Sequence, residues 1–185
     1  MEIAHFTTPL SDKLCHALGF EFVREFISRA RNKDDVVLNV PGYRQTKSYT
    51  CGFVSGLMVL HHFDRKQNAK KFYELCNPHF DWGMSTRKVA SALRKKNIKV
   101  SIKKLMPFDE LASLIEEGKP IITSIKRRDV IQHWVVIYGV NRKTKEVFVA
   151  GDKFWFSPVK TRMDWKSFRR RVASGADFLV CSKKN

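Results

Sequence analysis

Several features that mark other classes of protein are missing from this sequence of 185 residues. It has no run of about 18 apolar residues, so we expect no membrane-spanning helix. Its first residues, MEIAHFTTPLSDK, lack the basic stretch and apolar core of a secretory signal, which favours a cytoplasmic location. Repeats, low-complexity tracts and long linkers are also missing. These absences exclude a repeat array and predict one compact unit.

The sequence also lacks the usual signs of a disulfide framework or a metal site. Its four cysteines include no CxxC pair and have no secretory context, so we expect reduced thiols. Three of them, Cys15, Cys76 and Cys181, are expected to serve packing. Three of its histidines have no metal-ligand spacing, and we predict neither a metal nor a cofactor. The cysteines are Cys15, Cys51, Cys76 and Cys181, and these histidines are His5, His16 and His79.

Acidic residues are scarce. The chain has 18 Asp and Glu against 35 Lys and Arg, which gives a formal net charge of +17 and attraction to polyanions. No zinc finger or aromatic RNA-binding motif accompanies these charges, so solvated faces are the first interpretation. The alternative is that several basic clusters converge into a patch for acidic peptide, nucleic acid or an anionic membrane. The clusters lie at residues 94–96, 126–128, 143–145, 169–171 and 183–184.

Hydrophobic periodicity predicts helices in the first part of the chain and most strands in the later part. This order favours the α+β class, with a helical half packed on an antiparallel sheet. We divide the chain into an N-terminal helical segment, 1–35, and a single compact domain, 36–185. The predicted helices cover residues 11–30, 51–62, 68–76, 86–96 and 108–117, and the predicted strands cover residues 36–40, 98–102, 120–125, 133–140, 146–150 and 177–181.

The predicted helix that begins at Cys51 is apolar nearly all round, which is typical of a helix buried in the centre of a domain. A thiol at its start lies near the positive end of the helix dipole, which lowers a thiol pKa and favours the nucleophilic thiolate. Gly52 carries no side chain, so a substrate backbone is expected to approach the thiol there. The Cys51 amide and the side-chain amide of Gln45 are candidates for an oxyanion hole.

A nucleophilic cysteine needs a base, and the base needs a group that orients it. His133 begins one predicted strand and Asp152 follows the end of the next. If the two strands form an antiparallel hairpin, the carboxylate lies beside the imidazole. This arrangement predicts His133 as the general base and Asp152 as the residue that orients it.

These motifs together resemble the papain-like cysteine peptidases, with most similarity to the branch that contains the bacteriocin-processing (double-glycine) peptidases. The resemblance covers about residues 40–165 and implies the papain-like fold, with Cys51 as nucleophile, His133 as base and acid, Asp152 as orienting residue and Gln45 in the oxyanion hole. Many transporter-linked relatives have an acidic residue where this chain has Thr50, and they usually have a proline where it has Lys153. The residues that carry the resemblance are Val40-Pro41, Gln45, Thr50-Cys51-Gly52, Ser55, Leu57-Met58, Leu60, Gly118 to Ile122, His133 to Ile137, Gly139 and Gly151-Asp152.

The leading hypothesis is therefore a thiol hydrolase that acts on a peptide or protein, with acidic substrates favoured by the charge of the chain. A deamidase or an acyl-transferase with the same triad is an alternative. A hypothesis of another class is a catalytically silent basic binding module on the same scaffold, with salt-sensitive affinity for polyanions.

Overall fold

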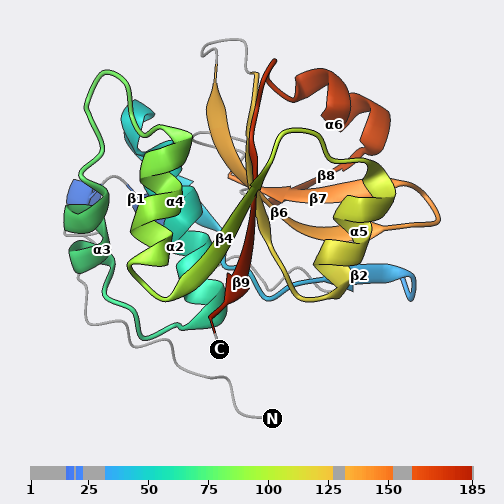
Figure 1. Cartoon of the computed structure of the whole chain (residues 1–185), viewed down its shortest axis with the longest axis horizontal. Helices are drawn as coiled ribbons and strands as arrows, with labels where there is room; N and C mark the ends of the chain where they lie inside the picture. The colour runs from blue at the N-terminus through green and yellow to red at the C-terminus, as the bar shows by residue number, and fades with distance from the viewer. Residues whose placement is uncertain (1–15, 19, 23–31, 127–131, 152–159, 185) are drawn as a thin grey trace.

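The computed structural model describes residues 16–18, 20–22, 32–126, 132–151 and 160–184. Helices lie on both sides of a central antiparallel sheet, with α2, α3 and α4 on one side and α5 and α6 on the other (Figure 1). Within the described part of the chain, no helix combines the length and apolar character needed to cross a bilayer. The helices are η1 (Ser48–Thr50), α2 (Cys51–Phe63), α3 (Ala69–Cys76), α4 (Thr86–Arg94), α5 (Phe108–Glu116) and α6 (Trp165–Arg171).

In the described ranges the main sheet has seven strands, in the order β4-β9-β5-β6-β7-β8 with β2 paired to β6, and β1 and β3 form a separate pair. Every pairing between the described strands is antiparallel, which confirms the α+β prediction. The strands are β1 (Phe20–Phe22), β2 (Asp35–Val37), β3 (Tyr43–Gln45), β4 (Ile98–Lys103), β5 (Ile121–Ile125), β6 (His133–Asn141), β7 (Glu146–Ala150), β8 (Lys160–Asp164) and β9 (Phe178–Lys183).

Side-chain caps explain why three helices begin where they do. The side chains of Asn68, Ser85 and Asp164 accept hydrogen bonds from the backbone N–H three residues later, at 3.0, 3.3 and 2.8 Å. These bonds satisfy amides that have no partner inside the helix. The first two helices were predicted from the sequence, and the third, α6, was not.

The prediction of a helix over residues 11–30 is wrong at Phe20–Phe22. These residues form strand β1, which pairs with β3 from Phe20↔Gln45 to Phe22↔Tyr43. Pairing with a distant segment outweighs the local four-residue spacing of apolar residues, because tertiary context overrides propensity. The pairing also crosses the boundary that we predict at residue 35. The division of the chain at that point stays a prediction.

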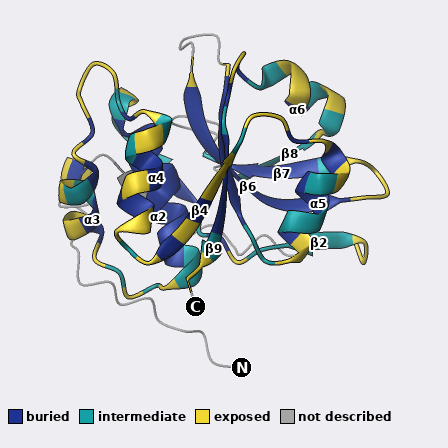
Figure 2. Ribbon diagram, in the orientation of Figure 1, coloured by how far each residue is buried: buried dark blue, intermediate teal, exposed yellow. Residues whose placement is uncertain are grey.

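Strand β6 divides the hydrophobic core into two layers. Its residues Trp134, Val136 and Tyr138 belong to the cluster under α2, α3 and α4, whereas Val135 and Ile137 belong to the cluster under α5 and α6. All of β6 is therefore buried, in contrast to the exposed outer faces of the helices (Figure 2). A β-bulge between Ile137 and Gly139 shifts this alternation by one residue, which places Val140 under α5 and α6.

Candidate active site

Cys51 begins α2 and directly follows the 3₁₀ turn of residues 48–50. The turn is closed at the Lys47 carbonyl, which accepts from the Thr50 amide at 3.2 Å and from the Thr50 hydroxyl at 2.9 Å. Cys51 is buried, as is nearly all of α2, which confirms the prediction of a central helix that starts at this thiol. Because Cys51 is the first residue of α2, its thiol lies next to the first amides of the helix. These amides have no partners within the helix.

Gln45 ends β3 and is buried beside this turn. Its side-chain Nε2 donates to the carbonyl of Ser48 at 3.0 Å and also to the carbonyl of Lys47. The amide therefore fastens the turn that precedes Cys51. To stabilise an oxyanion, Gln45 would exchange one of these two bonds for a bond to substrate.

Gly52 serves packing, and the expectation that it opens a path for substrate is wrong. A Cβ at this position would lie 2.9 Å from Cβ of Met84, 3.2 Å from Cγ2 of Val89 and 3.3 Å from Cδ1 of Trp134. These neighbours close the space over Gly52. Because core atoms so close to the backbone cannot move freely, an alanine here would cost about 1–3 kcal/mol of stability.

His133 begins β6 and is 2% exposed. Its Nε2 lies 2.5 Å from the carbonyl oxygen of Gly151, directly after β7. A carbonyl can only accept a hydrogen bond, so Nε2 carries the hydrogen and Nδ1 is the basic nitrogen of the neutral ring. The β6–β7 hairpin was predicted, but this backbone acceptor was not. Asp152 lies outside the described residues.

Contacts between α2 and β6 bring the regions of Cys51 and His133 together. Gly52 packs against Trp134. Cys51 directly precedes Gly52 in the sequence, and His133 directly precedes Trp134. Trp134 also donates from Nε1 to the carbonyl of Met84 at 3.0 Å. Cys51 and Trp134 belong to the same buried cluster. Two segments about 80 residues apart are thus joined at one point.

An aromatic loop, defined here as residues 77–85, lies against the same turn. Phe80 and Trp82 are 69% and 84% exposed, which is unusual for side chains of this size. The loop is close to the site because a Cβ on Gly83 would lie 3.1 Å from the carbonyl oxygen of Tyr49, in the turn before Cys51. The His79 ring stacks on Phe80 with centroids 5.1 Å apart. No sequence motif marked these aromatics, because their exposure depends on the fold.

The other described cysteines are free and differ from Cys51 in their surroundings. Burial raises the pKa of Cys76 to about 12 and also raises the pKa of Cys181. Both lie in the hydrophobic core, which confirms the prediction that they serve packing. Thiols with such pKa values remain protonated and unreactive at neutral pH.

His61 lies near the far end of α2 and belongs to the buried residues of this helix. It is buried, and its Nε2 donates to the carbonyl of Gln67 at 2.8 Å. Its Nδ1 therefore accepts from the Tyr43 hydroxyl at 2.5 Å. Because Tyr43 and Gln45 share β3, this bond ties the strand that holds Gln45 to the helix that begins at Cys51.

Burial of His61 predicts that the fold loses stability in mild acid. Burial lowers the pKa of His61 below its ordinary value of 6.5. The unfolded state therefore binds a proton that the folded state resists, so the free energy of unfolding falls as the pH drops below about 6.5. Urea unfolding at about pH 7.5 and about pH 5 measures this loss. The variant His61→Gln keeps a donor and an acceptor and does not titrate, so its loss of stability between these two pH values is expected to be smaller. An equal loss in the variant and in the unmodified protein would contradict the assignment of this effect to His61.

The sequence profile of the Peptidase C39-like family matches residues 37–171 of this chain. This range contains Gln45, Cys51, His133 and Asp152. A search of curated proteins finds no match.

Solved structures with the same fold include several peptidases. One is a double glycine motif protease from an AMS/PCAT transporter in complex with the leader peptide, with a TM-score of 0.57 at 18% identity over 79% of this chain and 94% of that one. The peptidase domain of Streptococcus ComA has a TM-score of 0.56 at 18% identity, over 74% of this chain and 95% of that one. A C39-like peptidase from Bacillus anthracis has a TM-score of 0.62 at 13% identity, over 82% of this chain and 99% of that one. These likenesses show the fold.

Proposed function

The chain belongs to the Peptidase C39-like family, and we propose that it cleaves amide bonds as a cysteine peptidase with Cys51 as nucleophile and His133 as base and acid. In this proposal Asp152 orients the imidazole and Gln45 contributes to the oxyanion hole. The observation that carries it is the bond from His133 Nε2 to the Gly151 carbonyl, because it leaves Nδ1 as the nitrogen that can take the thiol proton.

The proposed reaction runs in two stages. His133 takes the proton from Cys51, and the thiolate attacks the carbonyl carbon of the scissile amide. The resulting oxyanion accepts hydrogen bonds from the Cys51 amide and from Gln45, which gives up one of its bonds to the turn. The imidazolium then gives its proton to the leaving amine as the C–N bond breaks. Water, activated by the same imidazole, hydrolyses the thioester and restores the thiol.

A peptide is the proposed substrate. One solved neighbour was crystallised with a leader peptide, and the aromatic loop offers exposed rings beside the turn that leads to Cys51. Exposed aromatic side chains of this kind bind apolar groups of a partner at low cost in conformational entropy. The net charge of +17 favours the approach of acidic peptides.

Selective alkylation tests the proposed nucleophile without knowledge of the substrate. With iodoacetamide at neutral pH we expect Cys51 to react at least about 100-fold faster than Cys76 or Cys181. A pKa of about 12 leaves Cys76 with about one thiolate in 10⁵ molecules at pH 7. Peptide mapping by mass spectrometry assigns the rate to each cysteine. Equal rates in the folded protein would contradict the proposal.

A further inference from the structure

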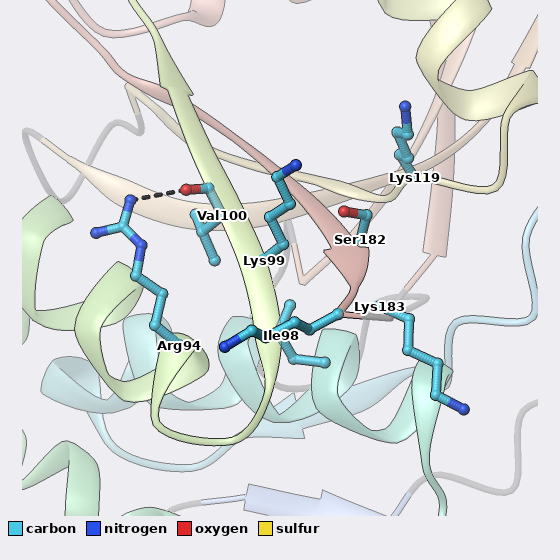
Figure 3. Close-up of a pocket in the computed structure, with 8 residues that line it drawn as sticks. Arg94, Ile98, Lys99, Val100, Lys119, Ser182 and Lys183 are labelled. Carbon is cyan, nitrogen blue, oxygen red and sulfur yellow. Dashed lines mark hydrogen bonds between the residues drawn. The ribbon is translucent and has the colours of Figure 1, made fainter.

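A basic groove lies along the edge strand β4 and the end of β9. Its volume is about 780 Å³. Figure 3 shows its side chains, which come from the end of α4, from β4, from the turn before β5 and from β9. The groove is lined by Arg94, Ile98, Lys99, Val100, Lys119, Ser182, Lys183 and Lys184.

A second recess, of about 470 Å³, continues this groove toward the end of α2. The two share Ile98, Lys183 and Lys184 and therefore adjoin each other. We call the two together the basic groove. The second recess adds Lys96 to the cationic residues.

The charge of the basic groove is strongly positive. Among the described residues that line the first part, five are cationic and none is acidic. Asp64 is the acidic residue in the lining of the second part, and Lys119 forms an ion pair with Glu117 beside the first part. So much charge of one sign in a recess attracts a polyanion through counterion release.

The basic groove lies far from the candidate active site. Cys51 begins α2, whereas Leu60 and Phe63 near its other end line the second recess. Thirteen residues of helix separate the two ends by about 18 Å. A ligand in the basic groove therefore does not occupy the space over the thiol.

We propose that the basic groove binds single-stranded nucleic acid through its phosphates, without preference for sequence. Two adjoining recesses suit a linear polymer, and a flexible single strand can follow recesses that a stiff duplex would only bridge. No aromatic side chain lines the first part among the described residues, so base stacking adds little selectivity there. An acidic peptide is less suited, because Arg94 Nη2 donates to the Val100 carbonyl at 2.7 Å and occupies an acceptor that an added strand would use.

Fluorescence anisotropy with a labelled oligothymidylate of about 20 nucleotides, over a range of salt concentrations, tests this proposal. Five phosphate contacts predict a slope of log K against log salt of about −3.5. The triple variant K99Q/K183Q/K184Q should weaken binding by at least about tenfold and reduce the slope by about 2. Thermal unfolding checks that the variant remains folded.

A second triple variant controls for total charge. K71Q/K145Q/K166Q removes the same charge from exposed lysines on α3, on the β6–β7 turn and on α6. It should weaken binding by less than about threefold, because these lysines lie outside the basic groove. Equal losses in the two variants would overturn the proposal, as would tighter binding of a matched duplex or of poly-glutamate. Neither result depends on whether the protein has peptidase activity.

Discussion

Replacing Cys51 with alanine is expected to reduce peptide hydrolysis by about 10⁴-fold or more, to the background rate. The reason is that the acyl-enzyme cannot form without the thiol, and no other described cysteine combines a helix start with contact to the β6 region. Release of fluorescence from a library of quenched peptides measures the loss. Because many sequences are present, the assay does not require the preferred substrate to be known.

Cys76→Ala is the matched control for this variant. It removes a buried thiol whose pKa is raised to about 12, so it should lower stability while the rate per folded molecule is retained. Hydrolysis by Cys51→Ala at a rate close to that of the unmodified protein would exclude Cys51 as the nucleophile. Loss of activity in both variants without unfolding would also count against the proposal.

The second large effect is expected at His133. His133→Gln should lower hydrolysis by about 10³-fold or more, since an amide cannot take the proton of Cys51. Glutamine still offers an N–H to the Gly151 carbonyl, so the bond that now joins β6 to the end of β7 can be kept. The measurement pairs the rate of hydrolysis with the rate of Cys51 alkylation across pH.

A purely structural histidine would give a different result. In that case His133→Gln would leave the pH profile of Cys51 alkylation unchanged, whereas loss of a base should remove the rise that follows imidazole deprotonation. His79→Gln is a control on the exposed aromatic loop, and its alkylation profile should match that of the unmodified protein. A shared profile for all three proteins would contradict the role of His133.

Long apolar segments made much of the fold predictable. Helix α2 is apolar on all sides, so a buried central helix follows from its composition alone. The β6–β7 hairpin follows from two apolar runs around a polar turn, and its antiparallel pairing is confirmed. Strands of three residues, such as β1 and β3, are too short to show an alternation. Strand β8 was missed because its residues are half-buried and mostly polar.

The candidate residues could be named from the sequence, whereas the tertiary contacts around them could not. Cys51 and His133 were predicted from residue type and position, and their roles stay predictions. The packing of Gly52 against Trp134 depends on two segments that meet only in the fold. The burial of His61 has the same origin, since its partners Tyr43 and Gln67 come from outside α2.

The hydrogen bond between His133 and Gly151 has a consequence for how this protein can change in evolution. Its acceptor belongs to the main chain, and main-chain groups persist when side chains are exchanged. The ring tautomer is therefore set independently of the residue that follows Gly151. Under the proposed function, a substitution of Asp152 would lower activity without changing which ring nitrogen of His133 carries the hydrogen.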